Sequence, residues 1–335
     1  MAEFPIGNLR AEKTSYPPEV EKIIYVSSTD KSLQPALFWK PAESKEPVPL
    51  LVALHTWSGS YDQAGGEVKY AEWCQKAGWA FIHPHFRGPN WTPEALGSDL
   101  VVADILDSVE FAKKQTAIDP SRIYCIGVSG GGHAALLMAG RAPETWAGVS
   151  AWCGISDIET WHRQGIKDGK VGKYARHIER ALGGPPDSSK ERKKSARHRS
   201  PVAWLGKASK VPLDINHGIN DGRSGSVPFT HSLHAWNAVV PTPAKLDPSS
   251  IDDFYQTRKP PEAFAGKDAL YGKRQPVFRR VHKNTRITIF KGGHEIIHEA
   301  ALNWLAAQKK GEVAKWKVSK TTELESTGEA MQSGK

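Results

Sequence analysis

The sequence predicts an α/β fold built on a mostly parallel, doubly wound sheet. Short apolar runs typical of buried strands alternate with amphipathic stretches typical of helices, which is the pattern of repeated βαβ units. Residues 49–54 form a continuous apolar run, as expected of a strand covered on both faces. A glycine-rich turn at residues 127–131 connects a further apolar run to a run of helix-forming residues. These three observations together define the fold class.

The first half of the chain supplies most of the predicted sheet. Two opening strands are expected at residues 20–27 and 34–40, because Ile, Tyr and Val gather in the first of them. A helix follows the buried run 49–54 at about residues 67–76, and a second buried strand is expected at 79–83. The next helix spans residues 100–114, where apolar side chains recur at helical spacing: Val101, Ile105, Val109 and Phe111. The tripeptide Asp119-Pro120-Ser121 is expected to stop this helix before the strand that ends at Ile126.

The second half continues the alternation with two interruptions. Strands are predicted at residues 147–152, 211–215 and 286–290, and a helix at about 295–307. Between them, residues 160–209 are polar, basic and partly helical, which resembles a small helical cap inserted over the sheet edge. Residues 241–281 lack periodicity and are expected to form a long loop. We therefore divide the chain into an N-terminal segment with the opening strands (1–48), a catalytic core (49–310) and a tail expected to be disordered (311–335).

Composition narrows the class of protein. The 335 residues are 39% hydrophobic, and no apolar run approaches the ~18 residues of a membrane span. The first residues lack the basic and apolar segments of a signal peptide, so a cytoplasmic location is expected by default unless a signal was removed. We expect Cys74, Cys125 and Cys153 to be small buried residues and not a disulfide framework or metal cluster.

The net charge of +9 raises the question of a nucleic-acid partner. The basic residues gather at 190–199, at 273–280 and after residue 309, without a helix-turn-helix, zinc-finger or base-stacking motif. A solvated face is therefore expected, with no nucleic-acid or membrane partner. The alternative is a basic rim that attracts an anionic substrate. The sequence does not specify an oligomeric state.

Ser129 occupies the centre of the turn Gly127-Val128-Ser129-Gly130-Gly131. A strand, a Gly-x-Ser-x-Gly turn and a helix together form the sequence pattern of a nucleophile elbow, which lifts one serine hydroxyl out of the sheet. The turn is strained, so its neighbours must be small. The pattern predicts a nucleophilic serine; the alternative is a glycine-rich connection or a phosphate-binding loop without chemistry.

A serine hydroxyl needs a base that is itself oriented by an acid. In this architecture the acid and base follow the serine, and Asp221 and His294 do so directly after the strands at 211–215 and 286–290. Both should therefore reach the same sheet edge as Ser129. His298 is a competing base one turn later, but Gly292 and Gly293 let the loop at His294 approach the serine closely.

Developing negative charge on a carbonyl oxygen requires an oxyanion hole. One donor is expected to be the backbone amide of Gly130, the residue after the nucleophile. The second should come from the loop after residues 49–54, which reads His55-Thr56-Trp57. Either the Thr56 or the Trp57 amide could serve.

From these residues the chain resembles the α/β-hydrolase superfamily, and within it the catalytic domain of the prolyl oligopeptidase family, from about residue 49 to 307. The resemblance rests on several motifs in addition to the serine turn: Phe86-Arg87-Gly88, Asp119-x-x-Arg122, Leu182-Gly183-Gly184-Pro185, Ser200-Pro201, His217-Gly218-x-x-Asp221 and Gly293-His294. The resemblance implies an α/β-hydrolase fold and acyl transfer through a serine, without a metal or organic cofactor. The chain departs from the family pattern in two ways. Large family members carry an N-terminal β-propeller, and the residues before 49 are too few to form one. Several of those peptidases use a tyrosine in the oxyanion hole, where this chain has the His55-Thr56-Trp57 loop.

These departures favour ester over peptide bonds. We therefore expect a serine hydrolase that cleaves carboxylic esters of a small molecule or oligosaccharide, with Trp57, Trp91 and His55 contacting the substrate, because indole surfaces suit sugar rings. The alternative from the same chemistry is a small serine peptidase acting on short peptides. An alternative of another class is a binding protein that kept the fold and lost turnover.

Overall fold

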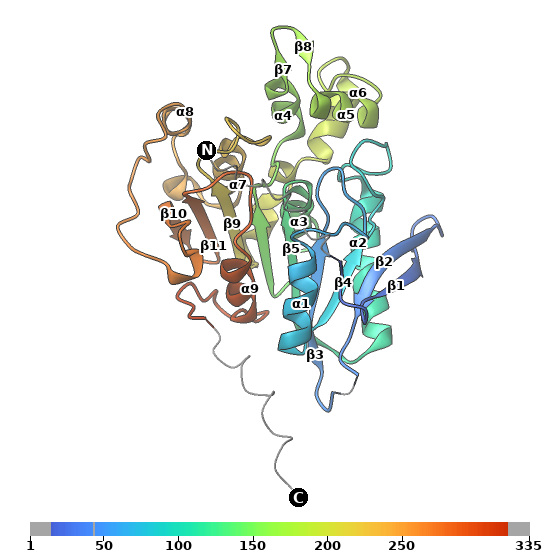
Figure 1. Cartoon of the computed structure of the whole chain (residues 1–335). Coiled ribbons are helices and arrows are strands. Elements are labelled where there is room, and N and C mark those ends of the chain that lie inside the picture. Colours follow the sequence, from blue (N-terminus) through green and yellow to red (C-terminus); the bar gives the residue numbers. More distant parts are fainter. Residues whose placement is uncertain (1–14, 43, 321–335) are drawn as a thin grey trace, which may run out of the picture.

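One mixed sheet forms the centre of the molecule. The computed structural model describes residues 15–42 and 44–320, and in this part of the chain nine strands follow the order β1-β2-β4-β3-β5-β6-β9-β11-β10 (Figure 1). Their bounds are β1 (Glu21–Val26), β2 (Leu33–Trp39), β3 (Val48–Leu54), β4 (Ala80–Pro84), β5 (Ile118–Val128), β6 (Gly148–Trp152), β9 (Leu213–Gly218), β10 (Pro276–His282) and β11 (Thr285–Phe290). The strands from β4 to β11 pair in parallel, and antiparallel pairs close both edges. The predicted doubly wound, mostly parallel sheet is confirmed.

Helices cover both faces of this sheet. α2 (Asp99–Gln115), α3 (Gly130–Arg141) and α7 (Thr230–Val239) pack on one face, and α1 (Val68–Ala77) and α9 (His298–Ala306) pack on the other. β3, β4 and β6 are buried along their whole length because both their faces are covered, which explains their continuous apolar sequences.

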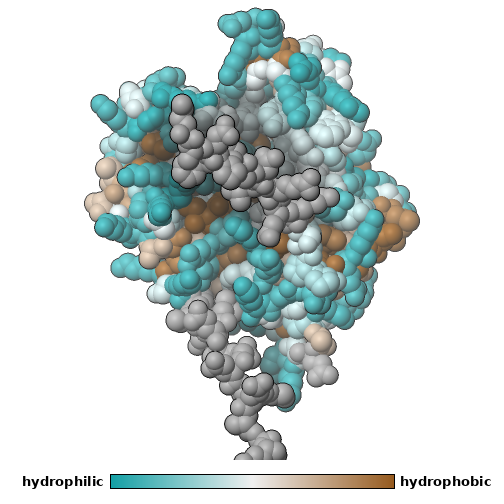
Figure 2. All heavy atoms as spheres, in the orientation of Figure 1, coloured by the Kyte–Doolittle hydropathy of each residue, from teal (hydrophilic) through white to brown (hydrophobic). Residues whose placement is uncertain are grey.

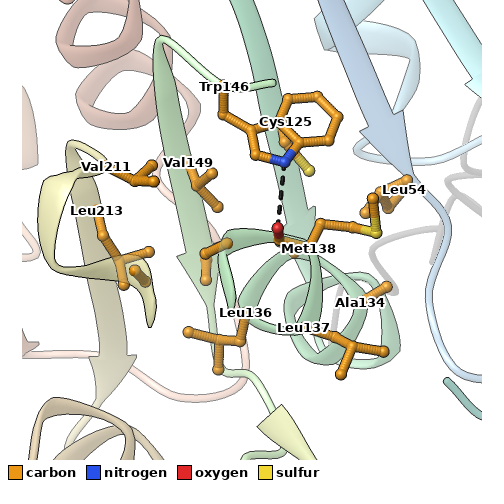
Figure 3. Packing of buried hydrophobic residues seen from close by; sticks show 14 of the residues in the cluster. Leu54, Cys125, Ala134, Leu136, Leu137, Met138, Trp146, Val149, Val211 and Leu213 are labelled. Carbon is orange, nitrogen blue, oxygen red and sulfur yellow. Dashed lines mark hydrogen bonds between the residues drawn. The ribbon is translucent and has the colours of Figure 1, made fainter. Parts of the chain in front are cut away.

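The face under α3 shows how this core is packed. Leu136 and Leu137 of α3 lie among Leu54, Cys125 and strand residues of β6, all without solvent exposure (Figure 3). The Trp146 indole donates a hydrogen bond to the Met138 carbonyl oxygen at 3.2 Å, so its one polar atom is satisfied. Each buried Leu contributes about 1.5–3 kcal/mol. The helix that follows the serine turn is therefore firmly fixed.

Residues 241–281 are more ordered than the sequence suggested. They contain the 3₁₀ turns η3 (Thr242–Ala244) and η4 (Ala269–Tyr271), the helix α8 (Pro248–Thr257) and the edge strand β10. Asp247 caps α8, because its carboxylate accepts hydrogen bonds from the amides of Ser249 and Ser250. The prediction of a structureless loop was wrong here.

The strand before the serine also begins earlier than expected. β5 starts at Ile118, so Asp119 and Pro120 lie inside the strand and not in a turn that precedes it. The pairing of β3 with β5 shifts register at this point, between Val48 and Leu50, and such irregularities accommodate a proline in a strand.

The insertion between β6 and β9 sits over the carboxyl ends of the strands, at the top of Figure 1. It contains α4 (Ile158–Gln164), the hairpin β7 (Ile166–Lys167) and β8 (Lys170–Val171), α5 (Lys173–Leu182), α6 (Lys190–His198), and the 3₁₀ turns η1 (Pro201–Ala203) and η2 (Leu205–Lys210). We call residues 157–210 the cap. Arg199 ties it to the loop before α2, because its guanidinium donates to the carbonyl oxygens of Ala95 (2.7 Å), Leu96 (3.3 Å) and Pro93 (2.9 Å).

The beginning of the predicted tail packs on the domain. Trp316 stacks on Trp304 with ring centroids 5.4 Å apart, and its indole donates to the Lys283 carbonyl oxygen at 3.0 Å. The prediction of disorder was therefore wrong for residues 311–320, whereas 321–335 lie outside the described residues. The three cysteines are buried and free. Among the described helices, none has the length and apolarity needed to cross a bilayer.

Candidate active site

The three predicted catalytic residues each follow a parallel strand of the central sheet. Ser129 comes directly after β5, Asp221 after β9, and His294 after β11. Because these strands run in parallel within one sheet, their carboxyl ends meet at one edge. The structure therefore brings the three residues to the same place from positions far apart in the sequence.

Ser129 sits in the strained backbone expected of an elbow. Its φ of 60° and ψ of −118° are unusual for a residue with a side chain, and its amide is held by the Trp152 carbonyl oxygen at 2.9 Å. Gly127 is required for the turn, because a Cβ there would lie 2.3 Å from the backbone carbonyl carbon of Gly131. The residue is 8% exposed and lines a cleft.

Asp221 and His294 form a short hydrogen bond. His294 Nδ1 lies 2.5 Å from Asp221 Oδ2, so Nε2 is the ring nitrogen left to exchange a proton. Both Ser129 and His294 line the same cleft. In the described part of the chain the Ser129 hydroxyl has no hydrogen-bond partner, and such bonds often tighten only when substrate is bound.

The Asp221 carboxylate is held on every side. Oδ1 accepts from the amides of Gly222 (2.9 Å) and Val227 (3.2 Å), and Oδ2 also lies 2.9 Å from His217 Nε2. Burial alone would raise the pKa of Asp221, but the hydrogen bonds from His217 and His294 outweigh it and hold the pKa well below its ordinary value. The carboxylate is therefore ionised at neutral pH and fixed in orientation.

His217 is a neighbour of Asp221 that the sequence argument did not assign. Its Nε2 faces two acceptors, Asp221 and the Val227 carbonyl oxygen at 3.0 Å, so this nitrogen carries the proton. Its Nδ1 lies 2.7 Å from the Ser232 hydroxyl. The sequence shows His217 and Gly218 shortly before Asp221, but it does not indicate in which direction the imidazole ring points.

The same place contains the one group of potential metal ligands found among the described residues. Cys153, His217 and Asp221 have ligand atoms within 4.8 Å of one another. Burial raises the pKa of the Cys153 thiol, so the thiol stays protonated, and His217 is already bonded to Asp221. A divalent metal would need the thiolate and free lone pairs, so the group fits a hydrogen-bonded cluster better than a metal centre.

His298, the competing base, is occupied elsewhere. Its Nε2 lies 2.8 Å from the Gly66 carbonyl oxygen, and burial lowers its pKa to about 4. It lines the cleft but has no contact with Asp221. His294 is therefore the histidine positioned for proton transfer.

The structure separates the two candidate oxyanion donors. The Thr56 amide donates to Gln63 Oε1 at 3.0 Å, as does the Thr56 hydroxyl at 2.9 Å. The Trp57 amide has no acceptor among the described residues, and a Cβ placed on Gly130 would lie 2.3 Å from this nitrogen. The Trp57 backbone thus lies against Gly130, next to Ser129, with its amide unbonded in the described part of the chain, whereas the Thr56 amide is engaged by a side chain.

Gln63 and Glu67 hold this loop, and neither was singled out from the sequence. Gln63 Nε2 donates to Glu67 Oε1 at 2.9 Å, which orients the amide so that its oxygen faces Thr56. Burial raises the pKa of Glu67. Nothing in the local sequence distinguishes these two residues from ordinary polar loop residues.

The cleft has a volume of about 480 Å³. Its walls come from the loop at Thr56 and Trp57, residues 63–67, the serine, Tyr174 and Ser226 near the cap, and residues 294–298. This volume is within the usual range for small-ligand sites.

Of the three residues predicted to contact the substrate, only Trp57 lines the cleft. Trp57 lines the cleft, but it is only 2% exposed, because its indole packs edge-on against Trp161 and donates to His177 Nδ1 at 3.1 Å. Trp91 packs on His177 with ring centroids 4.7 Å apart and is not part of the cleft wall. His55 is completely buried against Phe86, with burial lowering its pKa to about 4. The structure does not place His55 or Trp91 where a substrate in the cleft would touch them.

Residues 69–246, more than half of the chain, match the model of the prolyl oligopeptidase family. Among curated proteins the chain is similar to dipeptidyl aminopeptidase BIII of Pseudoxanthomonas mexicana, with 26% identity over 193 residues, which are 53% of this chain and 26% of that protein. The chain therefore covers about a quarter of this relative.

Solved structures support the fold. An acylaminoacyl peptidase of Pyrococcus horikoshii matches with a TM-score of 0.51 and 17% identity, covering 65% of this chain and 34% of that one. Prolyl oligopeptidase B of Galerina marginata matches with a TM-score of 0.52 and 19% identity, covering 71% and 35%. With the central sheet described above, these matches show an α/β-hydrolase fold.

Proposed function

The chain belongs to the prolyl oligopeptidase family of serine hydrolases, and we propose on this basis that it is a serine peptidase that cleaves short peptides. The observation that carries the proposal is that Ser129, His294 and the Trp57 loop line one cleft, with Asp221 bonded to His294 behind it. The curated relative that the chain matches is itself named as a peptidase, which favours the peptidase alternative over the predicted ester hydrolase.

In the proposed reaction the Ser129 hydroxyl attacks the scissile carbonyl carbon. His294 Nε2 accepts the hydroxyl proton and then delivers it to the leaving amine, while Asp221 holds Nδ1–H and stabilises the charged ring. The amides of Gly130 and Trp57 stabilise the oxyanion. A water molecule then attacks the acyl-enzyme by the same route and frees Ser129. No step calls for a metal or an organic cofactor.

A sugar ring in the cleft would need an exposed indole to stack on. Trp57 is buried and Trp91 lies outside the cleft wall, so neither indole supports the predicted carbohydrate ester. Activated esters need no leaving-group protonation and should still be turned over by the same residues. The alternative of a binding protein without turnover is disfavoured by the bonded Asp221–His294 pair next to the serine.

The test compares bond types on one enzyme preparation. The value of kcat/KM is measured for short peptides, p-nitrophenyl acetate and an acetylated xylooligosaccharide, with Ser129→Ala as control. Peptide cleavage that Ser129→Ala abolishes, with little deacetylation of the oligosaccharide, is the expected result. Faster deacetylation than peptide cleavage would restore the ester prediction. Absence of fluorophosphonate labelling at Ser129 would leave the binding-protein alternative.

A further inference from the structure

A second cavity, with a volume of about 360 Å³, lies beside the cleft. Its walls come from the end of α4, the β7–β8 hairpin, the start of α5 and the loop that follows Asp221. Tyr174 and Ser226 line both the cavity and the cleft, so the two spaces adjoin. A substrate bound at Ser129 can therefore extend into this cavity between the cap and the sheet edge.

The cavity wall is positively charged. Lys167 and Lys173 line it, and no Asp or Glu is among its lining residues. Neither lysine has an ion-pair partner among the described residues. By contrast the cleft itself is lined by Glu67 and Glu295. The two adjoining spaces thus differ in charge, and an anionic group would favour the cavity.

A half-buried arginine lies behind one wall. Tyr255 lines the cavity, and the Arg258 guanidinium stacks 4.2 Å from the Tyr255 ring and 5.1 Å from the Phe229 ring. All three guanidinium nitrogens are inaccessible and lack a hydrogen-bond partner among the described residues. Among the described residues no carboxylate forms an ion pair with Arg258, so its charge adds to the positive potential at this wall.

The cap concentrates the charge of the whole chain. Residues 157–210 contain fourteen Lys or Arg against six Asp or Glu, whereas the net charge of the chain is +9. This part of the surface, at the top of Figure 2, is mainly hydrophilic. Aromatic rings of Trp161, Tyr174 and Tyr255 form the rest of the wall and suit the methylene groups that precede a side-chain carboxylate.

We propose that this cavity is an accessory subsite that binds a carboxylate-bearing side chain of the substrate and makes the enzyme prefer acidic peptides. The Ser226 carbonyl oxygen accepts a hydrogen bond from the Trp161 indole at 2.9 Å, which fixes the wall shared with the cleft. The proposal rests on the peptidase function proposed above. It names the substrate class that the family match leaves open.

The test scans a glutamate through short peptides. Acetylated, C-terminally amidated tetra-alanine peptides carry Glu or Gln at one position each, and initial cleavage rates give the ratio of kcat/KM for Glu over Gln. At one position the wild-type ratio should reach about five- to tenfold at low salt, since two exposed lysines act together, and it should fall in 0.5 M NaCl. Lys167→Gln/Lys173→Gln should bring this ratio near one, because the Glu peptide loses more rate than the Gln peptide.

The matched control removes the same charge from outside the cavity. Lys170→Gln/Lys190→Gln changes two cap lysines that do not line it, and the Glu-to-Gln ratio should stay at the wild-type value. A wild-type ratio near one at every position would overturn the subsite. An equal loss of preference in both double variants would also overturn it, because it would assign the effect to the general charge of the cap.

A second readout separates this proposal from the peptidase proposal. The rate of fluorophosphonate labelling at Ser129 is measured with N-acetylglutamate or N-acetylglutamine as competitor. Stronger protection by the acid, lost in Lys167→Gln/Lys173→Gln, would support the subsite even if no peptide were cleaved. Peptide cleavage with equal rates for Glu and Gln, and equal protection by both competitors, would uphold the peptidase and reject the subsite.

Discussion

Replacing Gly130 by Ala tests the oxyanion hole by geometry alone. The new Cβ would lie 2.3 Å from the Trp57 amide nitrogen and 2.4 Å from the Trp57 Cα, both backbone atoms. Because real Cβ contacts are rarely under 3.0 Å, the two amides must move apart by at least about 0.7 Å. Hydrogen bonds to the oxyanion need distances near 2.7–3.1 Å, so a shift of this size removes about one donor.

The expected result is a decrease in kcat of about 10²- to 10³-fold with little change in KM, because the oxyanion forms after the substrate is bound. The assay is steady-state hydrolysis of the best peptide found for the wild type. Gly206→Ala is the matched control, since its Cβ would have no neighbour closer than 3.8 Å. A thermal unfolding curve shows whether each variant is folded. A folded Gly130→Ala enzyme with kcat within about threefold of wild type would refute the assignment of these two amides.

Three further predictions concern the histidines and their acid. His294→Ala should lower kcat by several orders of magnitude and His298→Ala by less than about tenfold, because only His294 is bonded to Asp221. Steady-state kinetics of the two variants measure this, and a larger loss in His298→Ala would contradict it. Asp221→Asn should lower kcat by about 10⁴-fold through the wrong ring tautomer, and a variant with near wild-type kcat would exclude Asp221 as the orienting acid. Burial lowers the pKa of His83 and of His231 to about 3, so the unfolded chain binds protons below about pH 6.5 that the folded chain does not. The free energy of unfolding should therefore fall as the pH drops from 6.5 toward 3, by about 1.4 kcal/mol per pH unit for each ring, and a Tm that is unchanged between pH 7 and 5 would contradict it.

The central strands were predictable because their environment is uniform. β3, β4 and β6 are covered by helices on both faces, so every position is apolar and the sequence alone marks them. β9 was found only in part, since it continues through the polar residues Asn216 and His217. Each of these buried residues has a partner outside the strand: the Tyr271 hydroxyl donates to Asn216 Oδ1, and His217 bonds Asp221 and the Ser232 hydroxyl. The sequence of the strand itself does not reveal these partners.

The edge strand β10 was harder to predict, because polar residues interrupt its apolar pattern. β10 pairs only with β11, and Arg279 and Arg280 in its middle obscure the apolar alternation of a strand. Arg279 nevertheless has partners for two of its nitrogens: Nη1 donates to Asp268 at 2.9 Å and Nε to the Thr288 hydroxyl at 3.0 Å. The arginine is thus held by residues of other segments, and the sequence of the strand alone does not identify them.

The reacting groups could be located from the sequence and their supports could not. Ser129, Asp221 and His294 have side chains whose chemistry is specific, and each follows a recognisable strand, so their order was enough to select them. Gln63 and His217 act through the direction in which an amide or a ring points. Such directions arise only when the chain is folded. Trp57 illustrates the converse, because an indole expected at the surface is buried by cap residues more than a hundred positions away.

The attachment of the cap by Arg199 has a consequence for how this protein can diverge. All the loop atoms that Arg199 binds before α2 are main-chain carbonyl oxygens. Every amino acid offers such an oxygen, so these three hydrogen bonds do not depend on which side chains the loop carries. The buried Leu96 is the exception among the loop side chains, because it packs in one cluster with Trp161 and Ile178 of the cap. Substitutions at the exposed positions Pro93 and Glu94 can therefore accumulate without releasing the cap, which Arg199 holds together with the His198–Asp99 contact. New side chains can be tried beside the active site at little risk to folding.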